Sequence, residues 1–235
     1  MVPTKNIHES FSRFFEEPTR ETLRDLLRTN FGETDQLDFK ASWPDFPKVA
    51  RHVLAIANSG GGAIVFGVEE AENSLDPKGL SDFRDKAEVA QGLKKYLPND
   101  LRHETLDFAY EASEYPALTG KSFQVIVVEH DDTSIPYLCL REGSDVKDNV
   151  VYVRRGTESA AANHDELQRI IDRRFRVMTE ERQNSLEEDL SQLSTLRLEL
   201  FKSQHVLAFA MHGHNDFLKN CIAQKEEVIL RKLQA

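Results

Sequence analysis

Three consecutive glycines, Gly60 to Gly62, separate a helix pattern from a buried-strand pattern, and no other feature restricts the possible folds as much. Before the glycines, residues 47–58 carry apolar side chains at the spacing of one helix face. After them, residues 63–68 form a continuous apolar run, which is typical of a buried strand. Glycine adopts positive φ angles at little cost. The sequence therefore predicts a tight helix-to-strand turn that leads into the middle of a sheet.

Further helices and strands are predicted on both sides of this turn. Helix patterns cover residues 18–29, where leucines recur at helical spacing, and residues 84–96 and 165–176. Strand patterns lie near residues 36–41, 106–111, 123–130 and 150–154. These segments predict one domain that mixes helices and strands.

The C-terminal part of the chain is predicted to be helical. Residues 165–205 contain neither glycine nor proline, and Gly213 is expected to divide this helix from a last one over residues 216–233. Four leucines follow a heptad-like spacing, namely Leu186, Leu190, Leu193 and Leu200. This seam indicates either a homo-oligomer or protein-partner interface, or a helical hairpin that packs back on the core.

Composition limits where the protein acts and how it could bind nucleic acid. The chain has 40 acidic and 30 basic side chains, a net charge of −10, whereas nucleic-acid binders are usually basic. Phosphate binding would need a local patch, and six arginines could form one: Arg154, Arg155, Arg169, Arg173, Arg174 and Arg176. A solvated helix face is the alternative interpretation. With two cysteines, no secretory signal and no apolar run long enough for a membrane span, a cytoplasmic address is expected.

Four motifs resemble a known family when they are taken in order. They are Glu33 to Lys40 (ETDQLDFK), Ala55 to Gly62 (AIANSGGG), Phe66 to Glu70 (FGVEE) and Tyr152 to Thr157 (YVRRGT). Together they resemble the Schlafen-type AlbA domain family, also called the divergent AAA or putative DNA-binding domain. The resemblance implies an α+β domain with a mixed sheet and packed helices over residues 18–175. Residues 1–17 would be an N-terminal extension, and residues 176–235 a helical tail for oligomer or partner contacts.

Acidic residues at two of these motifs could form a metal site. Glu33 and Asp38 are five residues apart and would share one side of the sheet if Glu33 lies in the turn after Gly32. Glu69 and Glu70 follow the buried strand, and strand ends are where α/β sites form. Carboxylate oxygens suit Mg²⁺ or Mn²⁺, which can activate water for phosphodiester cleavage.

The resemblance assigns roles to the same residues. Glu33, Asp38 and Glu70 (or Glu69) match the three acids of Schlafen-type ribonucleases, and Lys40 would steady developing charge or orient the water. Asp38 stands where the family pattern has glutamate, so its carboxylate reaches one methylene less far. The alternative is that Asp38 and Lys40 simply lie on a solvated strand face.

The glycine turn does not indicate an ATPase. No G-x-x-x-x-G-K-[ST] motif is present, so ATP as a cofactor is not supported. A structural turn is favoured over a phosphate cradle, and Asn58 is expected to cap the preceding helix.

Three interpretations of the function therefore remain. The leading interpretation is a metal-dependent nuclease that cleaves RNA or DNA, in a bacterial defence role that only the resemblance suggests. The alternative is a non-catalytic nucleic-acid-binding module or adaptor, and a nucleotide-sensing domain is third. In each case Arg154, which the family pattern includes, and its neighbours Arg155, Arg173 and Arg174 are the candidate nucleic-acid contacts.

Overall fold

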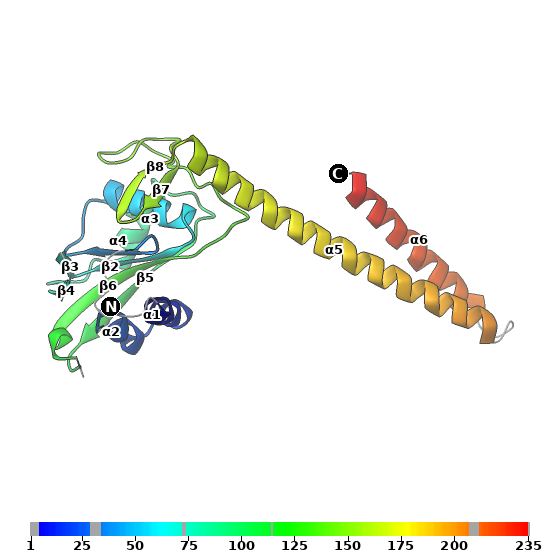
Figure 1. Cartoon of the computed structure of the whole chain (residues 1–235), viewed down its shortest axis with the longest axis horizontal. Coiled ribbons are helices and arrows are strands. Elements are labelled where there is room, and N and C mark those ends of the chain that lie inside the picture. The colour runs from blue at the N-terminus through cyan, green and yellow to red at the C-terminus, as the bar shows by residue number, and fades with distance from the viewer. Residues whose placement is uncertain (1–4, 29–33, 72–73, 114, 207–211, 235) are drawn as a thin grey trace. The chain divides into compact units, whose positions relative to one another are not determined.

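The computed structural model describes residues 5–28, 34–71, 74–113, 115–206 and 212–234, and it forms two compact units, residues 1–174 and 175–235 (Figure 1). The helices and strands of the first unit are α1 (Lys5–Glu16), α2 (Arg20–Arg28), β1 (Leu37–Lys40), α3 (Phe46–Asn58), β2 (Gly62–Phe66), β3 (Val68–Ala71), β4 (Ser74–Pro77), α4 (Lys86–Lys94), β5 (His103–Tyr110), a 3-10 turn (Pro116–Leu118), β6 (Lys121–Val128), β7 (Tyr152–Arg155) and β8 (Glu158–Ala161). α5 (His164–Val206) begins in the first unit and continues into the second, which ends with α6 (His212–Gln234). None of the described helices is both long and apolar enough to cross a membrane.

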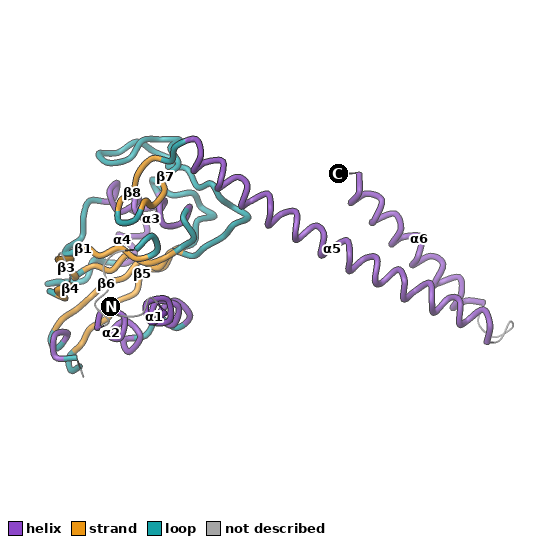
Figure 2. Tube along the Cα trace, in the orientation of Figure 1, coloured by secondary structure: helices purple, strands orange, loops and turns teal. Residues whose placement is uncertain are grey.

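The centre of the first unit is a mixed four-stranded sheet, whose strands are orange in Figure 2. Its strand order is β1-β2-β6-β5. β1 runs parallel to β2, whereas β2 pairs antiparallel with β6 and β6 with β5. Two separate hairpins, β3–β4 and β7–β8, accompany it. The predicted α+β class with a mixed sheet is confirmed.

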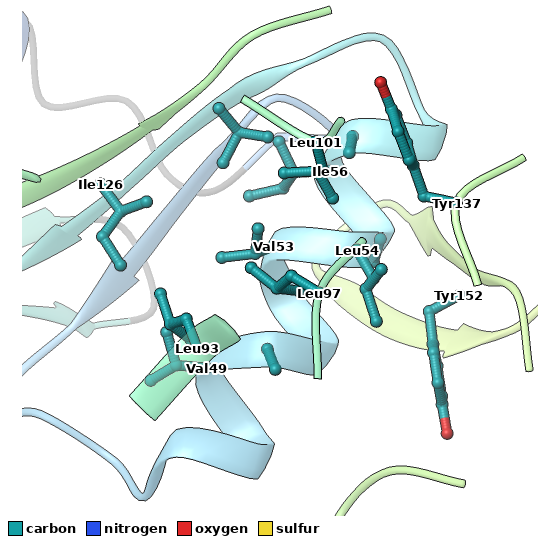
Figure 3. Close-up of a cluster of buried hydrophobic side chains, with 14 of the residues drawn as sticks. Val49, Val53, Leu54, Ile56, Leu93, Leu97, Leu101, Ile126, Tyr137 and Tyr152 are labelled. Carbon is teal, nitrogen blue, oxygen red and sulfur yellow. The ribbon is translucent and has the colours of Figure 1, made fainter. Parts of the chain in front are cut away.

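Each face of the sheet is covered by helices (Figure 1). On one face, α3 and α4 pack over a core that includes Val53, Leu93 and Ile126 (Figure 3). On the other face, α1 and α2 bury Phe14 and Leu23. The sheet therefore separates two apolar cores, and any polar side chain on β1 must enter one of them or reach its edge.

The four side chains of β1 point alternately to the two faces of the sheet. Leu37 and Phe39 belong to the core under α1 and α2. Side chains alternate along a strand, so Asp38 and Lys40 point toward α3. The register agrees, because Asp38 lies beside Ile64, a member of the α3 core.

The glycine turn forms as predicted, with φ angles of +117°, +77° and +156° at Gly60, Gly61 and Gly62. A Cβ on Gly62 would lie 2.1 Å from the carbonyl oxygen of Gln36, so only glycine lets β1 and β2 approach this closely. The expectation that Asn58 caps α3 is wrong. Its side-chain amide instead donates to the carbonyls of Tyr137 and Tyr152 and accepts from the backbone N–H of Tyr137.

Several segments differ from the sequence-based expectation. Residues 5–16, expected only as an extension, form α1, and its Phe14 is fully buried. The strand predicted over residues 63–68 is divided at Gly67, whose φ is +101°, and Val68 begins the β3–β4 hairpin. Gly213 lies within α6 instead of separating two helices.

The second unit pairs α6 with the C-terminal part of α5. Asp189 of α5 is 7% exposed and forms ion pairs of 2.5 Å with both Lys225 and Lys232 of α6. Leu193 is also buried, whereas Leu190 is 47% exposed. The four leucines of the predicted seam thus do not share one buried face.

Candidate functional site

Asp38, the central acid of the predicted site, is fully buried between β1 and α3. Its Oδ1 lies 2.8 Å from Nη1 of Arg154, and its Oδ2 lies 2.7 Å from Nζ of Lys40. Both carboxylate oxygens therefore face a positive group.

Arg154 reaches Asp38 from β7, and its side chain is also completely buried. Nη1 additionally donates to the hydroxyl of Ser159 at 3.2 Å, and Nη2 donates to the carbonyl of Thr34 at 3.2 Å. The backbone N–H of Arg154 donates to the hydroxyl of Ser59 in the glycine turn. These bonds tie the β7–β8 hairpin to β1 and to the end of α3.

His52 completes the group from α3. Its Nδ1 lies 3.0 Å from the hydroxyl of Ser159 and 3.8 Å from Oδ2 of Asp38. We call Asp38, Lys40, His52, Arg154 and Ser159 the Asp38 cluster. Its members come from β1, α3, β7 and β8, so the cluster forms only in the folded domain.

The charges in the Asp38 cluster are set by burial and by proximity. Burial lowers the pKa of His52 to about 4, and the nearby Lys40 and Arg154 lower it as well, so the imidazole is neutral at neutral pH. Burial tends to raise the pKa of Asp38, but the neighbouring His52, Lys40 and Arg154 outweigh it, and the net pKa is lowered. Asp38 is thus an ionised carboxylate held by two permanent cations.

Two other predicted acids, Glu69 and Glu70, are not among the hydrogen-bond or ion-pair partners of Asp38. Glu69 is half exposed and forms an ion pair with Lys78. Glu70 is exposed and is paired with Leu75 across the β3–β4 hairpin, which is separate from the four-stranded sheet.

A divalent ion does not fit the described part of the predicted metal site. Glu33, the remaining predicted ligand, lies outside the described residues. Within the described residues no three His, Cys, Asp or Glu side chains are grouped as metal ligands. Asp38 offers its oxygens to a guanidinium and an ammonium, and a metal ion added there would be repelled by both.

The arginines predicted to contact nucleic acid are engaged within the protein. Arg154 is buried, so it cannot touch a phosphate in this conformation. Arg155 forms a bidentate pair with Glu166, at 2.7 and 2.8 Å. Arg173 pairs with Asp132, and Arg174 donates to a backbone carbonyl at 3.2 Å. Each of these four side chains therefore already has a partner within the protein.

Sequence reasoning missed two members of the Asp38 cluster. His52 lies three residues after Val49 and one before Val53 in the apolar pattern of α3, and a titratable side chain in that position is a detectable signal of a buried polar contact. Ser159 carried no such signal, because the β7–β8 hairpin that positions it was not predicted.

Comparison with known proteins identifies the family. The family model described as Schlafen, AlbA_2 matches residues 33–163, which is more than half of the chain and covers β1 to β8. No curated protein matches the chain. The family match supports a nucleic-acid-related function. This chain belongs to the Schlafen AlbA_2 family.

Proposed function

We propose that this chain is a nucleic-acid-binding domain that does not cleave its ligand. The family supports the nucleic-acid partner. The observation that argues against cleavage is the complete burial of Asp38 between Arg154 and Lys40.

Catalysis by Asp38 would require access that the structure does not give it. A Mg²⁺ ion must lie about 2.0–2.1 Å from a carboxylate oxygen and usually keeps several waters. The side chain of Asp38 is 0% exposed, and that of Lys40, the most exposed ionisable member of the cluster, is 22% exposed. Admitting a hydrated ion and a phosphodiester would mean breaking the buried pair with Arg154, which is costly because it leaves charges uncompensated. The Asp38 cluster therefore acts as a structural link.

A metal-dependent nuclease is the competing function. In it, Mg²⁺ or Mn²⁺ would be held by Glu33, Asp38 and Glu70 or Glu69. The observation that favours it is the Asp38-Phe39-Lys40 sequence, which places an acid and a lysine on one face of β1 with 2.7 Å between their charged groups. A carboxylate next to a lysine can serve phosphodiester cleavage once a metal ion is bound.

One experiment separates these functions. The purified full chain is mixed with labelled single-stranded RNA, tRNA, single-stranded DNA and duplex DNA, with Mn²⁺ or with EDTA. Binding is followed by fluorescence anisotropy, and cleavage by denaturing gels. We expect binding to at least one of these nucleic acids and no Mn²⁺-dependent products.

Variants make the test specific. Mn²⁺-dependent products that disappear in Asp38→Asn, while the circular dichroism spectrum is kept, would overturn the proposal. Asp82→Asn is the matched control, because it makes the same change at an exposed position.

A further inference from the structure

A cleft between α1 and the glycine turn takes no part in the Asp38 cluster. α1 lines it with Phe11, Ser12, Phe15 and Glu16, and Gln36 and the three glycines of the turn complete the lining. Its volume is 260 Å³. Pockets for drug-sized ligands usually measure about 300–1,000 Å³, so this cleft suits one flat ring system rather than a larger ligand.

Two aromatic rings of α1 line the cleft. Phe14 is fully buried in the core and fixes the orientation of the helix. Phe11 and Phe15 are four residues apart, so they lie on the same side of α1. Their ring centres are 5.3 Å apart, with 42° between the ring planes, and both side chains are only half-buried. Unpaired bases stack on aromatic side chains of this kind, because every base has a flat π-face.

The glycine turn brings backbone rather than side chains to the cleft. Gly60 and Gly61 have positive φ angles, which disfavour any other residue there. The side-chain amide of Gln36 lies at the turn, since a Cβ on Gly60 would be 3.8 Å from its Nε2. A flat ligand in the cleft would therefore meet aromatic rings, peptide groups and a side-chain amide.

The polar side chains of the cleft favour a ligand that donates hydrogen bonds. Within the described residues, the side chains of Ser12, Glu16 and Gln36 form no hydrogen bond or ion pair. A carboxylate repels phosphate and accepts hydrogen bonds, whereas an amide both donates and accepts. Adenine, cytosine and guanine carry amino groups that can donate to a carboxylate, and uracil carries none.

We propose that this cleft holds one unpaired nucleobase, which stacks on Phe11 and Phe15 and donates from its amino group to Glu16. A base of a single strand and a free nucleoside offer the same edge. The strand is the expected source, because this inference rests on the proposed function. Stacking does not depend on neutralising phosphates, so it suits a chain with a net charge of −10.

The test measures the anisotropy of labelled 20-nucleotide oligo(A), oligo(C) and oligo(U) RNA with the full chain. Oligo(A) and oligo(C) should bind roughly 5-fold more tightly than oligo(U). Phe11→Leu and Phe15→Leu should each weaken binding of oligo(A) by roughly 5-fold or more. Phe83→Leu is the matched control, because it makes the same change at a 40% exposed phenylalanine outside the cleft.

Glu16→Gln tests the recognition of the amino group. It should lower the ratio of the oligo(A) and oligo(U) affinities by roughly 3-fold, since a hydrogen bond to an ionised acceptor is stronger. The lost charge alone affects both strands alike and leaves this ratio unchanged. Glu17→Gln is the matched control, because Glu17 is an exposed neighbour that does not line the cleft. Glu16 is itself exposed, so this variant decides the question if the phenylalanine variants fold poorly.

Calorimetry with adenosine separates the two sources of the base. If the parent binds the strands but the phenylalanine variants bind them like Phe83→Leu, only this inference fails. Oligo(U) binding as tight as that of oligo(A), or an unchanged ratio in Glu16→Gln, overturns it as well. Adenosine binding that Phe15→Leu abolishes, with no strand bound, supports the base site and overturns the proposed function. If the parent binds neither the strands nor adenosine, both proposals fail.

Discussion

Replacing Arg154 by methionine would leave the buried carboxylate of Asp38 with Lys40 as its remaining permanent cation. The change removes the 2.8 Å bond to Asp38 and the bonds to the hydroxyl of Ser159 and the carbonyl of Thr34. Breaking a buried ion pair by removing one partner costs about 3–5 kcal/mol. Lys40 still neutralises part of the charge, so we expect the lower half of that range. Such a loss is a large fraction of the roughly 5–15 kcal/mol that stabilises a domain.

The measurement is urea unfolding followed by the fluorescence of Trp43, the only tryptophan in the chain. Its ring stacks on Phe66 of β2 at 3.8 Å, so the signal reports the unit that contains the Asp38 cluster. Arg155→Met is the matched control. The Arg155 side chain is 42% exposed, and its pair with Glu166 should contribute less than about 1 kcal/mol.

A double-mutant cycle tests the cause of the loss. Asp38→Asn combined with Arg154→Met removes the buried carboxylate together with the buried guanidinium, and only the partly exposed Lys40 loses a charged partner. The double change should therefore be less destabilising than the sum of the single changes, with a coupling energy of about 1–3 kcal/mol. The reasoning is refuted if Arg154→Met costs no more than Arg155→Met, or if the two single losses simply add.

Three further predictions concern other parts of the chain. Burial lowers the pKa of His52 from 6.5 to about 4, so between these pH values only the unfolded chain binds this proton. The free energy of unfolding should therefore fall by up to about 3 kcal/mol as the pH falls through that interval. His52→Gln should flatten the pH dependence of the urea midpoint. Gly62→Ala should lower the free energy of unfolding in urea by at least roughly 2 kcal/mol more than Gly120→Ala does. Both glycines have a positive φ, but only a Cβ at Gly62 would clash with the carbonyl of Gln36. If the 60% exposed Phe201 of α5 contacts a second copy, Phe201→Glu should lower the mass measured by light scattering, and an unchanged mass would exclude this contact.

Local patterns were sufficient for the elements at the centre of the fold. The glycine turn and the apolar run after it predicted α3 and β2, because backbone freedom and hydrophobic periodicity are encoded within a few residues. The missed helix α1 had a readable signal as well, since Phe11, Phe14 and Phe15 recur at helical spacing. The ring of Phe14 in α1 packs against Phe108 of β5, with 6.2 Å between the ring centres. The sequence alone does not show that contact.

Long-range charge pairing was beyond such patterns. Asp38 and Arg154 are 116 residues apart, and each is preceded or followed by ordinary strand residues. Charged side chains are almost never fully buried unless they are paired, so the sequence favoured exposure for both. Only the tertiary contact between β1 and β7 reverses that expectation. The same limitation applies to Arg173, whose partner Asp132 lies in a distant loop.

The motifs that carry the family resemblance are joined in space by structural bonds. Asn58 at the end of α3 binds the backbone of Tyr152, and Ser59 accepts from the N–H of Arg154. Arg154 in turn reaches Asp38 on β1. Residues from three of the four motifs thus form one connected path that fastens the β7–β8 hairpin to the sheet. A chain could satisfy these motifs in order to fold, without performing any chemistry at them. The family match consequently predicts the architecture more directly than the activity.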